Sequence, residues 1–412
     1  MSLDLLSRTQ PDADRPGRDP AAYWPAMTEA IADRSGPVAA VNLAALRYNA
    51  LDMLVRAGGV PIRVASKSVR IREVIGGALA LPGYQGVLAF TLPEALWLAA
   101  HGDDDIVVGY PSVDRDAIGR LAADEDAAAR IAIMVDSIDQ LDIVDAVAAP
   151  GRRARLRLCI DADASWRVPV LGHLGVRRSP VHDVGEVANL ARAITARAGF
   201  TLVGLMMYEA QIAGTPDHEG IGDPMIRWMQ SRSGQELLVR RAGIVGALRE
   251  IAPLEFVNGG GTGSLELTAS DQSVTEVTAG SGLLAGHLFD RYRIFEPAPA
   301  AAFALEVVRK PAADIVTVLG GGWVASGPAV ASRQPMPVWP EGLHTLAREG
   351  AGEVQTPLQG DAAHSLRIGD RVWFRHAKSG ELAERVNTAL LIDDGAVVGQ
   401  APTYRGEGMA FL

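Results

Sequence analysis

Three lysines raise the question of amine chemistry in this 412-residue chain, because its other 36 basic residues are all arginines. Unlike arginine, lysine can lose its proton and act as a nucleophile or a base. The three are Lys67, Lys310 and Lys378. A genome-wide codon bias would also make lysine scarce, so the position of each lysine must decide between chemistry and coincidence.

Lys67 directly follows the short apolar run at 62–66, at the end of a predicted strand. An amine at the mouth of a barrel of parallel strands is partly removed from water, which favours its neutral form and frees it to form a Schiff base. The alternative is an ordinary lysine that reaches from the strand end to solvent. Lys310, which precedes a proline, is interpreted as a surface residue.

Two glycine-rich segments, NGGGTG at 258–263 and AGSG at 279–282, each combine unhindered backbone N–H groups with a hydroxyl. Loops of this kind can hold a phosphate group with neutral donors, and barrels commonly bind phosphate on their last loops. A single glycine run is also consistent with a tight turn. A lysine after the second strand and phosphate-binding loops after the last two strands match the two ends of pyridoxal 5′-phosphate, its aldehyde and its phosphate.

The elements that must position these residues alternate between strand and helix. Apolar runs at 38–43, 62–66, 86–90, 106–109, 131–135, 155–160, 202–207, 255–257 and 274–277 alternate with helix-compatible stretches at 44–56, 69–79, 92–101, 115–123, 138–148, 186–198 and 234–250. This alternation predicts parallel βαβ units, and their number favours a closed (β/α)8 barrel of the TIM type over an open sheet.

Changes in composition divide the chain into three predicted parts. Residues 1–37 are polar and proline-rich and are predicted to be an N-terminal arm. Residues 38–295 form the predicted cofactor-binding barrel. Residues 296–412 contain short apolar runs separated by glycine turns, without a long helical period, which predicts a C-terminal all-β domain; its segment 323–355 is predicted to be loop.

The overall composition excludes several classes of protein. A hydrophobic fraction of 48% and a charged fraction of 21% are typical of globular domains. The net charge of -10 disfavours nucleic acid as a partner, and a single cysteine, Cys159, excludes an internal disulfide. The first residues do not resemble a signal peptide, and no stretch is apolar enough to span a bilayer. We therefore expect a cytoplasmic protein without a membrane partner.

The order of several motifs resembles the fold-type III pyridoxal-phosphate enzymes. These motifs are VNLAALRYNA, IRVASKSVR, ID followed by LGHLGV, GLMMYEAQ, VNGGGTG and TEVTAGS. The family includes alanine racemase and, more similar to this chain, the D-threonine aldolase and D-serine dehydratase group. Further motifs, GGGWVASG, GEVQTP, GDRVWFRHAK and PTYRGEG, resemble actinobacterial proteins of the amino acid deaminase/aldolase type. The resemblance implies pyridoxal phosphate, a small amino acid substrate and a homodimer.

The resemblance also implies roles for individual residues. Lys67 matches the Schiff-base lysine, and Tyr208 matches a tyrosine beside the cofactor ring, although a core aromatic is an alternative for Tyr208. The residues that match the phosphate loops are Gly261, Thr262, Gly263, Gly280 and Ser281. An arginine that approaches the ring hydroxyl in the family is replaced here by His173, which can hydrogen-bond the ring oxygen with a pH-dependent charge. Arg167 or Arg177 could substitute for that arginine.

A metal site of the aldolase and dehydratase relatives is altered in this chain. They bind a divalent metal through a His-x-Cys or His-x-Asp pair, and the matching pair here is His376 and Lys378. A protonated lysine is a poor ligand and repels cations. Either His376 recruits a metal together with Glu381 or Glu384, or no metal binds and Lys378 supplies the positive charge beside the β-oxygen of the substrate. We favour the second interpretation. A third is that the segment around Lys378 is only a solvent-exposed turn.

These observations favour a lyase that acts on a small β-hydroxy amino acid, with the D configuration implied by the resemblance. The reaction would be dehydration with deamination, or retro-aldol cleavage. An amino acid racemase is an alternative, in which Tyr404 of a partner subunit would be the second base. A non-enzymatic pyridoxal-phosphate carrier is a further alternative, but the 117 residues after Phe295 count against this single-barrel type.

Overall fold

The computed structural model describes residues 3–5, 14–169, 172–218, 220–378 and 380–412. The chain forms two compact units that interleave along the sequence. Unit 1 contains Met1–Asp52, Ser68–Leu81 and Gly280–Ala410, and unit 2 contains Met53–Lys67, Pro82–Ala279 and Phe411–Leu412. Within the described ranges, no helix is both long and apolar enough to cross a membrane.

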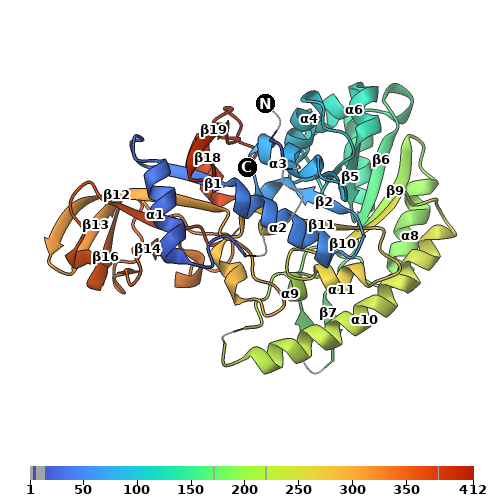
Figure 1. Ribbon diagram of the computed structural model, residues 1–412. Helices are drawn as coiled ribbons and strands as arrows, with labels where there is room; N and C mark the ends of the chain where they lie inside the picture. Colours follow the sequence, from blue (N-terminus) through green and yellow to red (C-terminus); the bar gives the residue numbers. More distant parts are fainter. Residues whose placement is uncertain (1–2, 6–13, 170–171, 219, 379) are drawn as a thin grey trace. The chain divides into compact units, whose positions relative to one another are not determined.

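Unit 2 is a closed barrel of eight parallel strands in the order β10-β11-β2-β3-β4-β5-β6-β9 (Figure 1). The strands are β2 (Ile62–Ala65), β3 (Tyr84–Ala89), β4 (Ile106–Val108), β5 (Ile131–Val135), β6 (Leu156–Asp161), β9 (Phe200–Met207), β10 (Phe256–Gly259) and β11 (Glu276–Ala279). Most of their residues are buried, which is typical of parallel strands covered by helices. With the separate sheet of unit 1, the barrel confirms the predicted fold class.

Helices cover the barrel and set the spacing between its strands. They are α4 (Leu92–Ala100), α5 (Arg115–Ala123), α6 (Glu125–Arg130), α7 (Ile138–Val147), α8 (Val184–Thr195), α9 (Ala210–Ala213), α10 (Asp223–Arg249) and α11 (Leu265–Ala269), with 3-10 turns η1 (Ser66–Ser68) and η2 (Pro150–Arg152). Capping boxes at Ser137 and Asp183 start α7 and α8. A hairpin of β7 (Trp166–Val168) and β8 (Gly172–Leu174) is inserted between β6 and α8.

Unit 1 is built on a nine-stranded sheet in the order β15-β16-β13-β12-β1-β18-β19, with β17 pairing to β12 and β14. The strands are β1 (Val38–Asn42), β12 (Ala301–Ala312), β13 (Ile315–Leu319), β14 (Met336–Trp339), β15 (His344–Thr345), β16 (Gln355–Gln359), β17 (Arg371–Arg375), β18 (Thr388–Asp393) and β19 (Ala396–Pro402). The predicted first strand of the barrel forms as β1, but it pairs with β12 and β18, so its placement in the barrel was wrong. The predicted loop at 323–355 contains β14 and β15.

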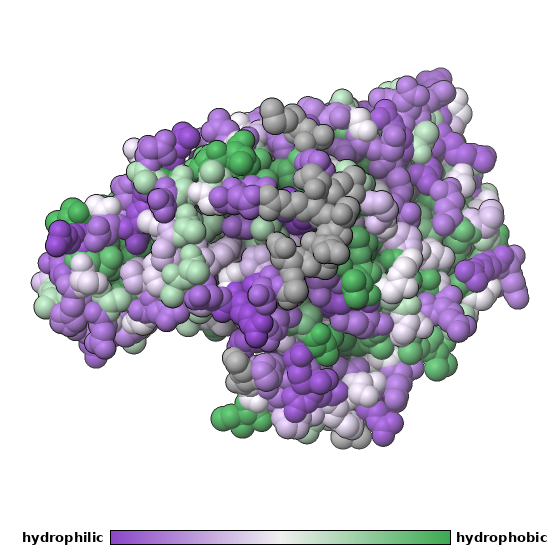
Figure 2. Space-filling view, viewed as in Figure 1, coloured by the Kyte–Doolittle hydropathy of each residue, from purple (hydrophilic) through white to green (hydrophobic). Residues whose placement is uncertain are grey.

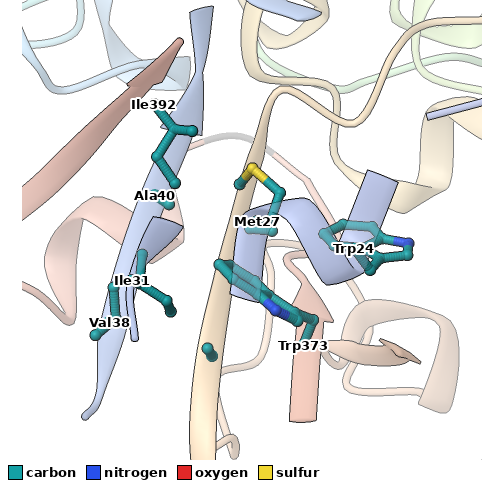
Figure 3. Close-up of a cluster of buried hydrophobic side chains, with 9 residues drawn as sticks. Trp24, Met27, Ile31, Val38, Ala40, Trp373 and Ile392 are labelled. Atoms are coloured by element: carbon teal, nitrogen blue, oxygen red, sulfur yellow. The ribbon is translucent and has the colours of Figure 1, made fainter. Parts of the chain in front are cut away.

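Helix α1 (Pro20–Ala30) packs into the core of unit 1. Its Trp24 and Met27 lie in one apolar cluster with Val38 of β1 and Trp373 of β17 (Figure 3). The indole Nε1 of Trp373 also donates to Thr28 Oγ1 at 2.9 Å. This part of the predicted arm is therefore a structural element of the core. The other helical segments are α2 (Leu43–Arg56), which spans both units, α3 (Arg72–Leu79), α12 (Ser281–Leu284), η3 (His287–Arg291), η4 (Ala331–Arg333), η5 (Asp361–His364) and η6 (Glu381–Glu384).

The interior of the barrel is filled by side chains. At the amino ends of the strands, the buried Arg63 donates to Glu276 at 2.7 Å and to Asp105 at 3.0 Å. The Arg63 guanidinium also lies 5.4 Å from the ring centroid of Phe256, which belongs to the apolar layer above it.

On the face in Figure 2, hydrophobic residues lie interspersed with hydrophilic ones, as on most protein surfaces. In parallel barrels of this kind, the chemistry takes place on the loops at the carboxyl ends of the strands.

Candidate active site

The alternation of side chains places three polar groups at the carboxyl end of the barrel interior. The apolar layer inside the barrel includes Met134, Cys159 and Met206. Side chains two residues further along a strand point to the same face. Asp136, Asp161 and Tyr208 therefore follow this layer at the carboxyl ends of β5, β6 and β9.

Lys67 lies in the same unit, in the turn η1 that directly follows β2. Its half-buried side chain donates from Nζ to the hydroxyl of Tyr110 at 2.9 Å, and Nζ lies 5.5 Å from the ring centroid. The guanidinium of Arg178 lies 6.0 Å from the same centroid. Ser66 anchors the turn through a hydrogen bond from Oγ to Leu88 O at 3.0 Å. The barrel thus holds the amine of Lys67 beside a phenol.

Tyr208 packs against the glycine-rich loop that follows β10. A Cβ atom on Gly261 would lie 2.8 Å from Ala213 Cβ and 3.2 Å from Tyr208 Cε2, so a larger residue would force its neighbours apart. Burial, followed by the negative charge of Glu209, raises the pKa of Tyr208 to about 12. The phenol is therefore neutral at physiological pH.

A buried carboxylate fixes the start of the same glycine-rich loop. Glu209 accepts hydrogen bonds from the backbone N–H of Gly260 at 3.2 Å and from Ser264 Oγ at 3.2 Å, and also from Thr268 Oγ1. Arg241 of α10 donates from Nη2 to Glu209 at 3.1 Å, and both side chains are 1% exposed. A buried ion pair therefore fixes the start of the loop that carries Gly261, Thr262 and Gly263.

Glu209 and Arg241 were not predicted as site residues. Glu209 directly follows Tyr208, and its place after a strand was the signal that could have identified it. Arg241 lies within a long helix, and nothing in the local sequence distinguishes it from the exposed arginines nearby. Tyr110 and Arg178 were also missed, because only the folded chain brings Tyr110 beside Lys67 and Arg178 beside the ring of Tyr110.

Asp161 and Asp136 form a carboxylate pair at the mouth of the barrel. The neighbours Ile160 and Val135 are in register on adjacent parallel strands, which places the two carboxylates beside each other. Burial, with a further contribution from the charge of Asp136, raises the pKa of Asp161 to about 7, while Arg178 opposes this shift. Asp161 therefore changes its charge near neutral pH.

An Asp161→Asn variant is expected to be more stable than the natural protein at alkaline pH. The folded-state pKa of Asp161, about 7, lies above its ordinary value of 3.8. The contribution of the protonated carboxyl group to the free energy of unfolding is therefore fully present below pH 4, and it is lost as the pH rises through 7. At pH 9 the gain should be on the order of 3 kcal/mol, and at pH 5 it should be much smaller. Urea unfolding at both pH values measures it, with the exposed Glu250→Gln as control; an equal difference at both pH values contradicts the assignment.

Four further predicted residues of the site, Gly280, Ser281, His376 and Lys378, lie in unit 1. Gly280 and Ser281 directly follow the last strand of the barrel, and Ser281 Oγ donates to Ser68 Oγ at 2.9 Å. His376 is 3% exposed, and its Nδ1 atom has no hydrogen-bond partner in the described part of the chain. Burial, with the charge of Arg375, lowers the pKa of His376 to about 3, so this ring stays neutral.

The surroundings of His376 bear on the metal site that the resemblance implies. Within the ranges that the structure describes, no three His, Cys, Asp or Glu side chains come together in a way that could hold a metal ion. Glu384 pairs with Arg70 at 2.5 Å, and Glu381 accepts a hydrogen bond from the backbone of Ser326 at 3.1 Å. We therefore derive no reaction step through a metal.

Arg167, His173 and Arg177 lie together in the segment between β6 and α8 and line one pocket. Arg167 pairs with Asp163 at 2.8 Å, and His173 Nε2 lies 2.9 Å from the carbonyl oxygen of Val176. Arg178 lines the same pocket. The pocket therefore brings together all three residues that were predicted as alternatives for the ring-oxygen contact.

Comparisons with known proteins agree with this geometry. Residues 41–282 match the family described as alanine racemase, N-terminal domain. Among solved structures, D-threonine aldolase from Filomicrobium marinum is similar at 18% identity and a TM-score of 0.77, over 92% of this chain and 97% of that one. D-threo-3-hydroxyaspartate dehydratase from Delftia sp. HT23 is 19% identical, with a TM-score of 0.69 over 89% and 97% of the two chains.

Alanine racemase from Bacillus anthracis is 17% identical, with a TM-score of 0.59 over 90% of this chain and 98% of that one. The comparison with curated protein sequences gave no match. At these identities the solved structures show a shared fold, and the match to the family covers more than half of the chain. The protein thus belongs to the alanine racemase N-terminal domain family and, with it, to the fold-type III pyridoxal-phosphate enzymes.

Proposed function

We propose that the protein is a pyridoxal-phosphate-dependent lyase that acts on a small β-hydroxy amino acid, with the D configuration. The observation that carries the proposal is the placement of Lys67, whose amine is held beside Tyr110 at the carboxyl end of the barrel. Two similar structures, a D-threonine aldolase and a D-threo-3-hydroxyaspartate dehydratase, support the choice of reaction and of the D series.

The described residues fit the cofactor. Lys67 offers an amine for the aldehyde end, and the loop from Gly261 to Gly263 offers a small, preformed cradle for the phosphate end, because Glu209 already fixes its start. Gly280 and Ser281, which directly follow β11, are proposed as the second phosphate loop. When bound, pyridoxal phosphate supplies an aldehyde that condenses with amines and a ring that stabilises negative charge at Cα.

The protein's own residues then supply the proton transfers. In dehydration, the amine of Lys67 removes the proton from Cα of the substrate, and the β-hydroxyl group leaves. In retro-aldol cleavage, the β-hydroxyl group loses its proton and the Cα–Cβ bond breaks. Tyr110 holds the amine of Lys67 through its hydroxyl at 2.9 Å and so orients it for either task.

Product analysis distinguishes the possible reactions. The purified protein is incubated with the D and L forms of serine and threonine, in deuterated water as well as in ordinary water. Release of a keto acid with ammonia supports dehydration, and release of glycine with an aldehyde supports retro-aldol cleavage. Deuterium at Cα without either product would contradict the lyase proposal and support the racemase. The burial of Tyr404, which is 1% exposed within unit 1, favours the lyase.

We further propose that Lys378 supplies positive charge to the β-oxygen of the substrate in place of a metal ion. The support is the sequence, in which Lys378 takes the second place of the metal-binding pair. His376, as a neutral imidazole, is proposed to act beside it. The homodimer and the cytoplasmic location stay predictions, of which light scattering tests the first.

A Lys378→Asp variant is expected to lose activity by about a hundredfold without added metal. The substitution removes the ammonium and creates a His-x-Asp pair with ligands that suit divalent cations. Added Mn²⁺ or Zn²⁺ should restore part of the activity to this variant, and a chelator should remove it again. A Lys378→Met variant is the control, because it removes the charge without creating a ligand. Sensitivity of the unmodified protein to chelators would contradict the proposal.

A further inference from the structure

The motif PTYRGEG forms a tightly bonded turn at the carboxyl end of β19 in unit 1. Its first glycine, Gly406, is required there, because a Cβ atom at this position would lie 1.8 Å from the carbonyl oxygen of Asn387. The backbone N–H of Gly406 donates to Thr403 Oγ1 at 3.1 Å. The backbone N–H of Met409 closes the turn by donating to the carbonyl oxygen of Tyr404 at 2.8 Å. The proposed reaction gives this turn no task.

This turn is bonded to the segment that directly follows the predicted Schiff-base lysine. The backbone N–H of Tyr404 donates to the carbonyl oxygen of Arg70 at 2.9 Å. Arg72 Nε donates to the carboxylate of Glu407 at 3.0 Å. Arg70 Nη1 also donates to Glu384 Oε1 at 2.5 Å. All of these residues belong to unit 1, and we name them the arginine clasp: Arg70, Arg72, Glu384, Tyr404 and Glu407.

Arg70 has a backbone conformation that is uncommon for its residue type. Its φ angle of 54° lies in the left-handed region, which a residue with a Cβ atom adopts only at a cost in free energy. Such conformations persist where the surrounding contacts hold them, and they cluster at functional sites. The contacts that hold Arg70 are those of the clasp, since its carbonyl oxygen bonds Tyr404 while its guanidinium bonds Glu384.

Lys67 lies between two anchored points of the chain. On its amino side, Ser66 Oγ donates to Leu88 O at 3.0 Å. On its carboxyl side, only two residues separate it from Arg70. Consecutive Cα atoms lie about 3.8 Å apart, so a shift of Arg70 reaches Lys67 over a very short length of chain. Release of Arg70 would therefore move the turn from which the amine of Lys67 reaches Tyr110.

We propose that the arginine clasp positions Lys67, and that the turn PTYRGEG is the fixed end of this clasp. The inference rests on the proposed function, which needs Lys67 in place, and it adds the residues that hold the turn of this lysine. A single ion pair between partly exposed side chains contributes little, but several charges that form a network contribute more. Here two ion pairs, from Arg70 and Arg72, are joined by the backbone hydrogen bond from Tyr404.

Chemical labelling of the cofactor-free, full-length protein tests the clasp without any turnover. Arg70→Asn removes the ion pair with Glu384 but suits the left-handed backbone, which asparagine adopts more readily than most residues. Acetic anhydride should modify Lys67 at least about threefold faster in this variant, and the backbone amide of Tyr404 should exchange its hydrogen at least about tenfold faster. Lys310 is the internal reference, and its rate of modification should not change.

Further variants decide whether the ion pair is the cause. Arg70→Lys keeps a donor for Glu384 and should return both rates to within about twofold of the natural protein. Arg371→Gln is the matched control, because Arg371 belongs to the same unit but donates to the carbonyl oxygens of Ile31 and Arg34; it should change neither rate. Unchanged rates in Arg70→Asn, no recovery in Arg70→Lys, or equal changes in Arg371→Gln would overturn the inference. If a circular-dichroism melt shows that Arg70→Asn does not fold, Glu384→Gln removes the same ion pair.

Binding of the cofactor separates this inference from the function beneath it. Arg70→Asn should bind pyridoxal phosphate at least about tenfold more weakly than the natural protein, because the amine that meets the aldehyde is displaced. An unchanged affinity, with the cofactor still on Lys67, overturns the inference and leaves the proposed function intact. Labelling and exchange rates that follow the prediction, in a protein that binds no pyridoxal phosphate, support the clasp and overturn the proposed function.

Discussion

A Lys67→Ala variant is expected to lose activity by about a thousandfold or more, together with the absorbance band of the bound cofactor. Lys67 is the single lysine of unit 2, since Lys310 and Lys378 belong to unit 1. No other amine of the barrel can therefore replace it at Tyr110. The measurements are kcat/KM for the best amino acid substrate and the visible spectrum of the purified variant.

Lys310→Arg is the matched control for this experiment. Lys310 is exposed, and its Nζ donates to the carbonyl oxygens of Ala363, His364 and Leu366 at 2.8 to 2.9 Å. Its contacts are therefore structural, and the spectrum should remain unchanged. An intact cofactor band in Lys67→Ala, or its loss in Lys310→Arg, would contradict the role assigned to Lys67.

An Arg241→Met variant is expected to lose about 3 to 5 kcal/mol of unfolding free energy. The substitution leaves the buried carboxylates of Glu209 and Asp271 without their cationic partner. Because Glu209 fixes Gly260, the affinity for pyridoxal phosphate should also fall, by about tenfold or more. Urea unfolding and a fluorescence titration with the cofactor measure the two effects.

A double variant, Glu209→Gln with Arg241→Met, tests the reason for this loss. Glutamine keeps a hydrogen-bond acceptor for Gly260 and Ser264 while removing the buried negative charge. The double variant should therefore be more stable than Arg241→Met alone. A double variant that is less stable than the single one would show that the charge of Glu209 is not the cause. Arg249→Ala, on the same helix, should not change either measurement.

Local patterns in the sequence predicted the barrel well, because each βαβ unit carries its own period. The helix at 92–101 and the strand at 131–135 are formed as α4 and β5, nearly at the predicted bounds. The run at 38–43 shows the limit of this reasoning. Its apolar residues specify a buried strand but not the partner strands, and β12, which pairs with it, lies more than 250 residues away in the sequence.

Helix α10 was predicted to start at residue 234 but starts at Asp223. Residues 230–233, Gln-Ser-Arg-Ser, are all polar and interrupt the apolar period, so the predicted helix began only after them. Packing against α8 and the β7 strand holds the helix instead. Tertiary contacts of this kind have no local signal.

The residues of the candidate site likewise differ in whether the local sequence predicts them. Lys67 and the loop at Gly261 were predicted because a lone lysine and a glycine run are unusual in themselves. Tyr110 and Arg241 were not predicted, because each acts through a residue on another element. The hydroxyl of Tyr110 lies 2.9 Å from Nζ of Lys67, and Nη2 of Arg241 lies 3.1 Å from the carboxylate of Glu209. Reactive groups can be recognised by type, whereas the groups that position them become visible only in the fold.

The most direct test of the central proposal is to reduce the purified protein with borohydride and map its peptides by mass spectrometry. Borohydride converts an imine between pyridoxal phosphate and a lysine into a stable adduct, which remains on the peptide that carries that lysine. We predict the adduct on Lys67, which the structure holds beside Tyr110. An adduct on Lys310 or Lys378 instead, or no adduct on any of the three lysines in a protein supplied with the cofactor, would contradict the account.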